Sequence, residues 1–121
     1  MATNVRVIHA RDFIRARPDG VADVERAERM LAELAAQSAA LGEFEILIDT
    51  RQVSGSLSAG QLWHLAEKFA QYQRTFARKT AILCPLERFD HARFFSLCAE
   101  NRGFNVTAFH SYEEAMEWLI G

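Results

Sequence analysis

Three short apolar segments of the chain alternate with longer segments in which apolar residues recur at helical spacing. The apolar segments are FEILIDT (44–50), TAILCP (80–85) and FNVTAF (104–109). Their length and composition are typical of strands that are buried on both faces of a sheet. Strands that alternate with helices form parallel sheets through right-handed crossovers, and the helices then cover the sheet. The sequence therefore predicts an α/β fold.

The amino-terminal part of the chain departs from this alternation. NVRVIHA (4–10) and FIRARP (13–18) are two extended runs that follow each other closely, which predicts a β-hairpin. The sequence PDG at residues 18–20 then predicts a turn before the first helix. Together with the later strands, the hairpin gives a mixed sheet of four or five strands.

The spacing of the apolar residues predicts four helices. They cover about residues 21–41, 58–77, 92–98 and 111–119. Gly42 follows the first helix and ends it. Ser58 with Gln61, and Ser111 with Glu114, have the spacing of a capping box, in which the serine oxygen accepts a hydrogen bond from the third amide of the helix.

Three basic residues lie near the end of the second predicted helix. Arg74, Arg78 and Lys79 are expected to complement the negative end of the helix dipole. The alternative is that these charges attract a phosphate group or an acidic partner.

Length and composition limit the classes of protein to which the chain can belong. Its 121 residues, half of them hydrophobic, predict one domain over residues 1–121. A formal net charge of −2 argues against nucleic-acid binding, and no apolar run reaches the ~18–20 residues that span a bilayer. The amino terminus lacks the layout of a signal peptide, so we expect a cytoplasmic protein. Cys84 and Cys98 lie among apolar neighbours and are expected to pack in the core.

Polar side chains are expected to gather in the loops that follow the parallel strands, because ligands bind beyond the carboxyl ends of such strands. The loop after the first apolar strand carries Asp49 and Arg51, which can pair with each other. It also carries Ser54, Ser56 and Ser58, which suit turns and helix caps.

No catalytic motif accompanies these residues. The serines form neither the G-x-S-x-G turn of a hydrolase nor a glycine-rich phosphate loop. His91 and His110 lie in separate segments, without the spacing of metal ligands. We therefore expect a non-enzymatic protein with no catalytic residue, no metal and no cofactor. A hydrolase that pairs one of these histidines with a loop serine is the remaining enzymatic alternative.

The order of elements and three segments resemble the STAS superfamily, whose best-known members are the SpoIIAA-like anti-sigma-factor antagonists. The segments are FEILIDTRQVSGSLSAGQL (44–62), KTAILCP (79–85) before an aromatic-rich helix, and VTAFHSYEEAMEWL (106–119). The chain is most similar to the small SpoIIAA-like bacterial proteins of the STAS/SEC14 type, over nearly its whole length. This resemblance implies a STAS-like fold and a regulatory module that binds a protein partner.

In SpoIIAA-like antagonists, a D-S-x-G segment after the equivalent strand carries a serine that the partner kinase phosphorylates. By distance from Asp49, that segment falls on residues 57–60, where the serine and glycine match and Leu57 replaces the acidic residue. The resemblance thus implies partner switching through the 49–60 loop, by a phosphate at the start of a helix. The candidate partner or phosphorylation residues are Asp49, Arg51, Ser54, Ser56, Ser58 and Gly60.

The relation to SEC14-type proteins implies an alternative function. Related folds carry a lipid or another apolar molecule in a cleft between the sheet and the helices. The candidate wall residues of such a cleft are Trp63, Phe69, Phe94 and Phe95. The sequence leaves the identity of the partner or ligand open, and an oligomer remains possible.

Overall fold

A mixed five-stranded sheet lies at the centre of the protein. The computed structural model describes residues 7–9, 13–39 and 44–120. The first strand pairs antiparallel with the second, and all other pairs are parallel. This sheet confirms the predicted hairpin and the predicted mixed sheet. In spatial order the strands are β1 (Val7–His9), β2 (Phe13–Ala16), β4 (Glu45–Asp49), β6 (Thr80–Leu83) and β7 (Val106–Phe109).

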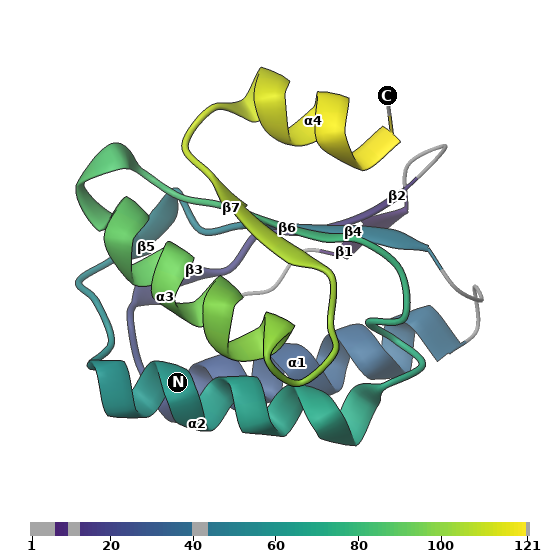
Figure 1. The fold of residues 1–121 in the computed structure, drawn as a ribbon, viewed down its shortest axis with the longest axis horizontal. Helices are drawn as coiled ribbons and strands as arrows, with labels where there is room; N and C mark the ends of the chain where they lie inside the picture. The colour runs from purple at the N-terminus through teal and green to yellow at the C-terminus, as the bar shows by residue number, and fades with distance from the viewer. Residues whose placement is uncertain (1–6, 10–12, 40–43, 121) are drawn as a thin grey trace.

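Four helices cover the two faces of this sheet unequally (Figure 1). Three of them lie on one face and the last one lies on the other. From β2 onward each new strand is added on the same side of the previous one, so right-handed crossovers place every connecting helix on the same face. The helices are α1 (Val24–Ala39), α2 (Ala59–Phe69), α3 (Phe89–Glu100) and α4 (Tyr112–Ile120).

The central strands are buried on both faces, as their apolar sequences predict. Along β4, Ile46 and Ile48 pack under α1–α3, whereas Leu47 faces α4. Successive side chains of a strand point to opposite faces, so one apolar run contributes to both cores. The smaller core beneath α4 contains Phe13, Leu47, Ala81, Leu83, Ala115 and Leu119.

Phenylalanine side chains form the centre of the larger core. Phe69, at the end of α2, is fully buried and stacks on Phe76, with the ring centroids 4.1 Å apart. Phe95 and Phe104 contact the same ring edge-on, at 5.2 and 5.5 Å between centroids. Phe69 therefore holds the end of α2 against α3 and the segment before β7.

The predicted turn at residues 18–20 is wrong. Asp19–Val21 form a short strand, β3, which pairs in parallel with a second short strand, β5 (Gln52–Ser54). Gly20 has a φ of +83°, which glycine adopts without strain. Val21 consequently belongs to a strand, and α1 begins three residues later than predicted. The residues predicted to end α1, Leu41 and Gly42, lie outside the described residues.

The second helix is shorter than predicted, and this moves the basic residues away from its end. After Phe69 the chain makes a 3₁₀ turn over residues 70–72. Arg78 forms an ion pair with Glu45, at 3.1 Å between Nε and Oε1. Lys79 donates a hydrogen bond of 2.9 Å to the carbonyl of Trp118, in the last turn of α4. The positive charge of Lys79 therefore complements the dipole of α4 instead of α2.

The helix starts differ in how they are capped. Ser58 and Gln61 form the predicted capping box at α2. At α4, Ser111 accepts the predicted hydrogen bond from the amide of Glu114, at 3.3 Å. The third helix begins earlier than predicted, because a 3₁₀ turn over residues 86–88 leads directly into it.

We expect the Phe69→Ala variant to lose about 3–5 kcal/mol of unfolding free energy, because it removes a buried ring and leaves a cavity. Phe94→Ala is the matched control, since the Phe94 side chain is 38% exposed. It should cost about 1 kcal/mol or less. Urea denaturation of both variants measures the difference, and equal losses would contradict the assignment of Phe69 to the core.

Candidate functional site

Asp49 is the last residue of β4. Its carboxylate lies on the face that α4 covers and is fully buried. Arg51 donates three hydrogen bonds to it. Its backbone N–H and its Nε bond Oδ1 at 3.1 and 2.9 Å, and a terminal guanidinium nitrogen bonds Oδ2 at 2.8 Å. The expected pair therefore forms, and it fixes the course of the chain as it leaves the strand.

Two further arginines, whose role the sequence did not reveal, reach the same carboxylate from β2 and from the residue that follows it. A terminal nitrogen of Arg15 donates a hydrogen bond of 3.3 Å to Oδ2, and Nε of Arg17 lies 3.7 Å from that oxygen. The aromatic ring of Tyr112 packs against the guanidinium groups of Arg15 and Arg51, at 5.6 and 5.7 Å. The period-2 alternation of FIRAR was the available signal, since it puts both arginines on one face of the strand.

The pKa of Asp49 reflects two opposing effects. Burial alone would raise it, because a charge is poorly solvated inside a protein. The hydrogen bonds and the charge of Arg51, together with the hydrogen bond from Arg15, outweigh burial and hold this pKa below its ordinary value of 3.8. Asp49 is therefore ionised at neutral pH, and its oxygens are hydrogen-bonded to arginine. It is a structural anion and would be a poor general base.

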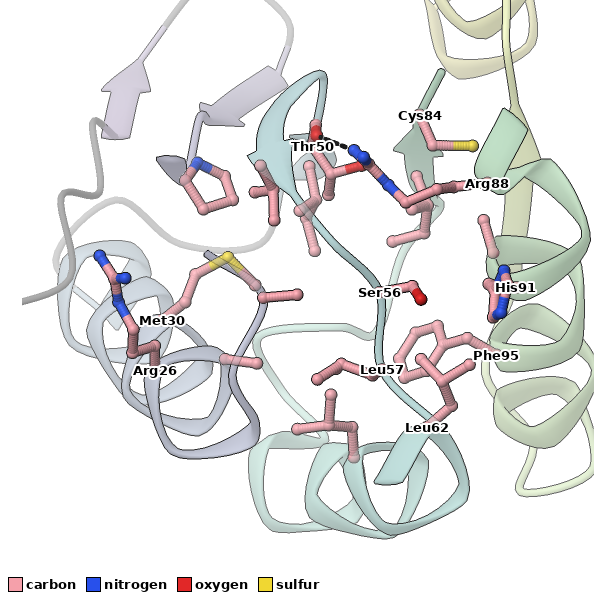
Figure 2. A pocket seen from close by; sticks show the side chains of 18 of the residues that line it. Arg26, Met30, Thr50, Ser56, Leu57, Leu62, Cys84, Arg88, His91 and Phe95 are labelled. Carbon is pink, nitrogen blue, oxygen red and sulfur yellow. Dashed lines mark hydrogen bonds between the residues drawn. The ribbon is translucent and has the colours of Figure 1, made fainter. Parts of the chain in front are cut away.

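The middle of the loop lies on the other side of β4, against the α1–α3 layer. Ser54 belongs to β5, and its hydroxyl donates to the carbonyl of Gly20 at 3.4 Å. Gly55 follows with a φ of +76°, where the chain turns. Ser56 lies in the wall of a cavity, toward which its hydroxyl points (Figure 2). Ser54 is thus a pairing residue of β5, and Ser56 borders a cavity.

Ser58 is the exposed first residue of a complete capping box. Its Oγ accepts a hydrogen bond of 3.2 Å from the amide of Gln61, and the Gln61 side chain accepts one of 2.9 Å from the amide of Ser58. Gly60 lies in the first turn, and a Cβ at this position would meet no atom within 4 Å. Leu57, which takes the position of the acidic residue, packs against the larger core. The start of α2 is therefore anchored by Leu57 and leaves Ser58 open to solvent.

A cavity of about 180 Å³ lies between the helices and the carboxyl ends of β4 and β6 (Figure 2). Most of its wall is apolar, and the polar side chains that border it are Asp19, Asp23, Arg26, Thr50, Ser56, Arg88 and His91. Arg88 bridges part of the rim by donating a hydrogen bond of 2.8 Å to the carbonyl of Thr50. The lining residues of α1–α3 include Ala27, Met30, Leu31, Leu62, Leu65, Phe69, His91, Ala92 and Phe95.

The predicted wall residues of an apolar cleft divide into two pairs. Phe69 and Phe95 line the cavity. Trp63 and Phe94 do not line it, and their side chains are 48% and 38% exposed on the outer surface. Trp63 instead lies beneath the guanidinium group of Arg102, at 4.8 Å. Helical spacing identified aromatic residues of α2 and α3 but could not distinguish the inner from the outer members.

The described residues differ from what an activated nucleophile or a metal site requires. Burial raises the pKa of the Cys84 thiol to about 11, so the thiol stays protonated at neutral pH. In the part of the chain that the structure describes, no hydrogen bond joins His91 or His110 to a serine. The described residues contain no group of three or more histidine, cysteine, aspartate or glutamate side chains that could hold a metal ion. None of the described helices is long and apolar enough to cross a membrane.

Comparison with solved structures identifies the fold. An uncharacterized protein of the DUF3478 family with a SpoIIAA-like fold, from Shewanella loihica PV-4, is 19% identical and has a TM-score of 0.64, over 98% of this chain and 94% of that one. An anti-sigma factor antagonist from Mycobacterium paratuberculosis is 16% identical with the same TM-score, over 99% and 96%. No protein-family model and no curated protein matches the chain. The chain therefore has a SpoIIAA-like fold, as the resemblance implied.

We expect Asp49→Asn to lower the unfolding free energy by about 1.5–3 kcal/mol at neutral pH, because hydrogen bonds to a charged group are lost. The pKa of Asp49 is lower in the folded than in the unfolded protein. The stabilisation by its charge is therefore complete above pH 3.8 and disappears as the pH falls through the lower, folded pKa.

Urea denaturation of wild type and variant across this pH range measures the effect. Glu33→Gln, which neutralises an exposed carboxylate of α1, is the control and should change little at any pH. A difference between wild type and Asp49→Asn that stays the same at acid pH would contradict the role of the charge.

Proposed function

We propose that this SpoIIAA-like fold serves as a non-enzymatic regulatory module of the STAS type, which binds a protein partner through the β4–α2 connection and the start of α2. One observation carries the proposal: Ser58 is an exposed N-cap residue at the position where the resemblance expects a regulatory serine. A solved anti-sigma factor antagonist with the same fold adds support. The proposal includes one domain over residues 1–121 and a cytoplasmic location.

A phosphate on Ser58 would change the surface of this region without destroying the helix. It would add about 1.5–2 negative charges at a helix amino terminus, where the dipole favours an anion. The capping oxygen would stay next to the amide of Gln61, to which it is already bonded. Leu57 would remain anchored in the core, since its contacts do not involve the hydroxyl. The partner would therefore encounter the same backbone with a different charge.

The non-enzymatic part of the proposal rests on the state of the polar groups. The carboxylate of Asp49 is buried and paired with arginine. The Cys84 thiol is buried and has a raised pKa, which argues against a nucleophilic role. These groups stabilise the fold and leave the surface around Ser58 for recognition.

We expect Ser58→Asp to weaken binding of the partner at least tenfold and Ser58→Asn to leave it near the wild-type value. Aspartate and asparagine are both good N-cap residues, so the two variants differ in charge and share the cap. The partner is captured from host extract on the wild-type protein, and its affinity for each variant is then measured with purified components. Equal affinity for both variants would contradict control by charge at Ser58.

The mass of protein isolated from its own host provides a direct check of the modification. A phosphate-sized increment that survives denaturation and maps to Ser58 would support the switch. The same increment on another residue, with Ser58 always bare, would remove Ser58 as the regulatory position.

The second candidate function is the binding of a small apolar molecule, and the cavity beneath the loop favours it. A dry apolar cavity of about 150 Å³ can hold benzene, whereas pockets for drug-sized ligands usually exceed about 300 Å³. At about 180 Å³, this cavity suits a single ring or a short chain, and a whole lipid would require the helices to separate. Ser56 and His91 at the wall could bond one polar end of such a ligand.

We expect Ala27→Leu to exclude such a ligand, because Ala27 lines the cavity and a leucine side chain would fill part of it. Ala36→Leu, on the exposed side of the same helix, is the control and should still bind. Native mass spectrometry of protein from the host reports a ligand as a mass increment that denaturation removes. An increment of equal size and occupancy in both variants would place the ligand elsewhere.

A further inference from the structure

The cluster of Arg15, Arg17 and Arg51 holds more positive charge than its single buried carboxylate requires. All three guanidinium groups lie within 3.7 Å of one oxygen, Oδ2 of Asp49. One arginine in two-point contact already satisfies a carboxylate, and Arg51 makes that contact. The other two arginines add positive charges beside it, and like charges at this spacing repel each other.

Several guanidinium donors of the cluster are also unused. Arg15 makes one side-chain hydrogen bond with the described residues, and Arg17 makes none. Their Nε atoms are inaccessible to solvent and have no hydrogen-bond partner within the described residues. Buried donors are nearly always satisfied, so the arginines have more hydrogen-bonding capacity than Asp49 uses.

The outer side of the cluster is open to a ligand. The Arg15, Arg17 and Arg51 side chains are 23%, 34% and 39% exposed, while Asp49 beneath them is fully buried. The helix α4 packs on β4, β6 and β7, and contacts between α4 and β2 are few, so Arg15 of β2 and Arg17 after it lie beside the helix. Asp49 and the ring of Tyr112 hold the guanidinium groups of Arg15 and Arg51 in place. Donors fixed in this way lose little freedom when they bind an anion.

From these observations we propose that Arg15, Arg17 and Arg51 form a binding site for a phosphate dianion, either free or as the phosphate of a small monoester. The three arginines and Asp49 together carry a net charge of +2, which a dianion balances and a single carboxylate would not. Guanidinium forks match the geometry of phosphate oxygens. The charge of the exposed Glu113 also acts on Arg51 and lowers the local excess.

This site shares Arg51 with the β4–α2 connection, but Arg15 and Arg17 lie outside that connection. Asp49 shares the sheet face of Leu47, beneath α4, whereas Ser58 begins a helix that covers the opposite face. A variant at Arg17 therefore leaves the Ser58 surface unchanged. Loss of phosphate binding and loss of partner binding can be measured separately, and either can occur without the other.

The decisive variant is Arg17→Gln, because Arg17 makes no hydrogen bond to Asp49 and its removal leaves the buried pair intact. Arg74→Gln, which removes an exposed arginine outside the cluster, is the control. Inorganic phosphate is titrated against chloride at equal ionic strength, and affinity is followed by thermal stability and by the Nε–H resonances of the arginines in NMR spectra. The wild type and the control should bind phosphate, and Arg17→Gln should bind at least ~10-fold more weakly.

The stability of the variant without phosphate separates a binding role from a structural one. In chloride alone, Arg17→Gln should be as stable as the wild type or more stable, since a repulsive charge is removed. In phosphate, the wild type should become the more stable protein. Equal losses of stability in both buffers, or equal phosphate affinity of the variant and the wild type, would overturn the proposal. A parallel titration with phenyl phosphate distinguishes the two sources, since a preferred monoester binds more tightly than the free ion.

Discussion

The buried carboxylate of Asp49 connects three parts of the molecule that are distant in sequence. It ends β4, accepts hydrogen bonds from the backbone and side chain of Arg51, and accepts another from Arg15 of β2. The same arginines contact the ring of Tyr112 at the start of α4. A buried charge is tolerated only when it is paired and hydrogen-bonded, so the buried position of Asp49 requires these contacts. The course of the β4–α2 connection follows from them.

The sheet separates two surfaces with different chemistry. On the face of α1–α3, the loop after β4 closes over an apolar cavity and then presents Ser58 at the start of a helix. On the other face, α4 is short, and the surface beside it carries arginines instead of apolar side chains. This division follows from topology, because the three crossover helices must share one face and leave the other to the carboxyl-terminal helix.

The cavity depends on the pairing of β3 with β5. This pairing joins residues 19–21 to residues 52–54, so that the approach to α1 and the loop after β4 form one continuous wall. The hydrogen bond from Arg88 to the carbonyl of Thr50 ties a third segment to the same rim. Three connections of the chain therefore form the rim of this cavity.

The sequence by itself determined the elements whose signals are local. The apolar strands, the helical spacing, the Ser58–Gln61 cap and the pair of Asp49 with Arg51 all involve residues within a few positions of each other. Only the tertiary structure decided the rest, because those features join residues about thirty or more positions apart. The β3–β5 strands are too short for a periodic pattern, and the second and third arginines reach Asp49 only once β2 lies beside β4. Likewise, whether an aromatic residue of α2 or α3 faces the cavity or the solvent depends on how the two helices pack, a choice that their own sequences leave open.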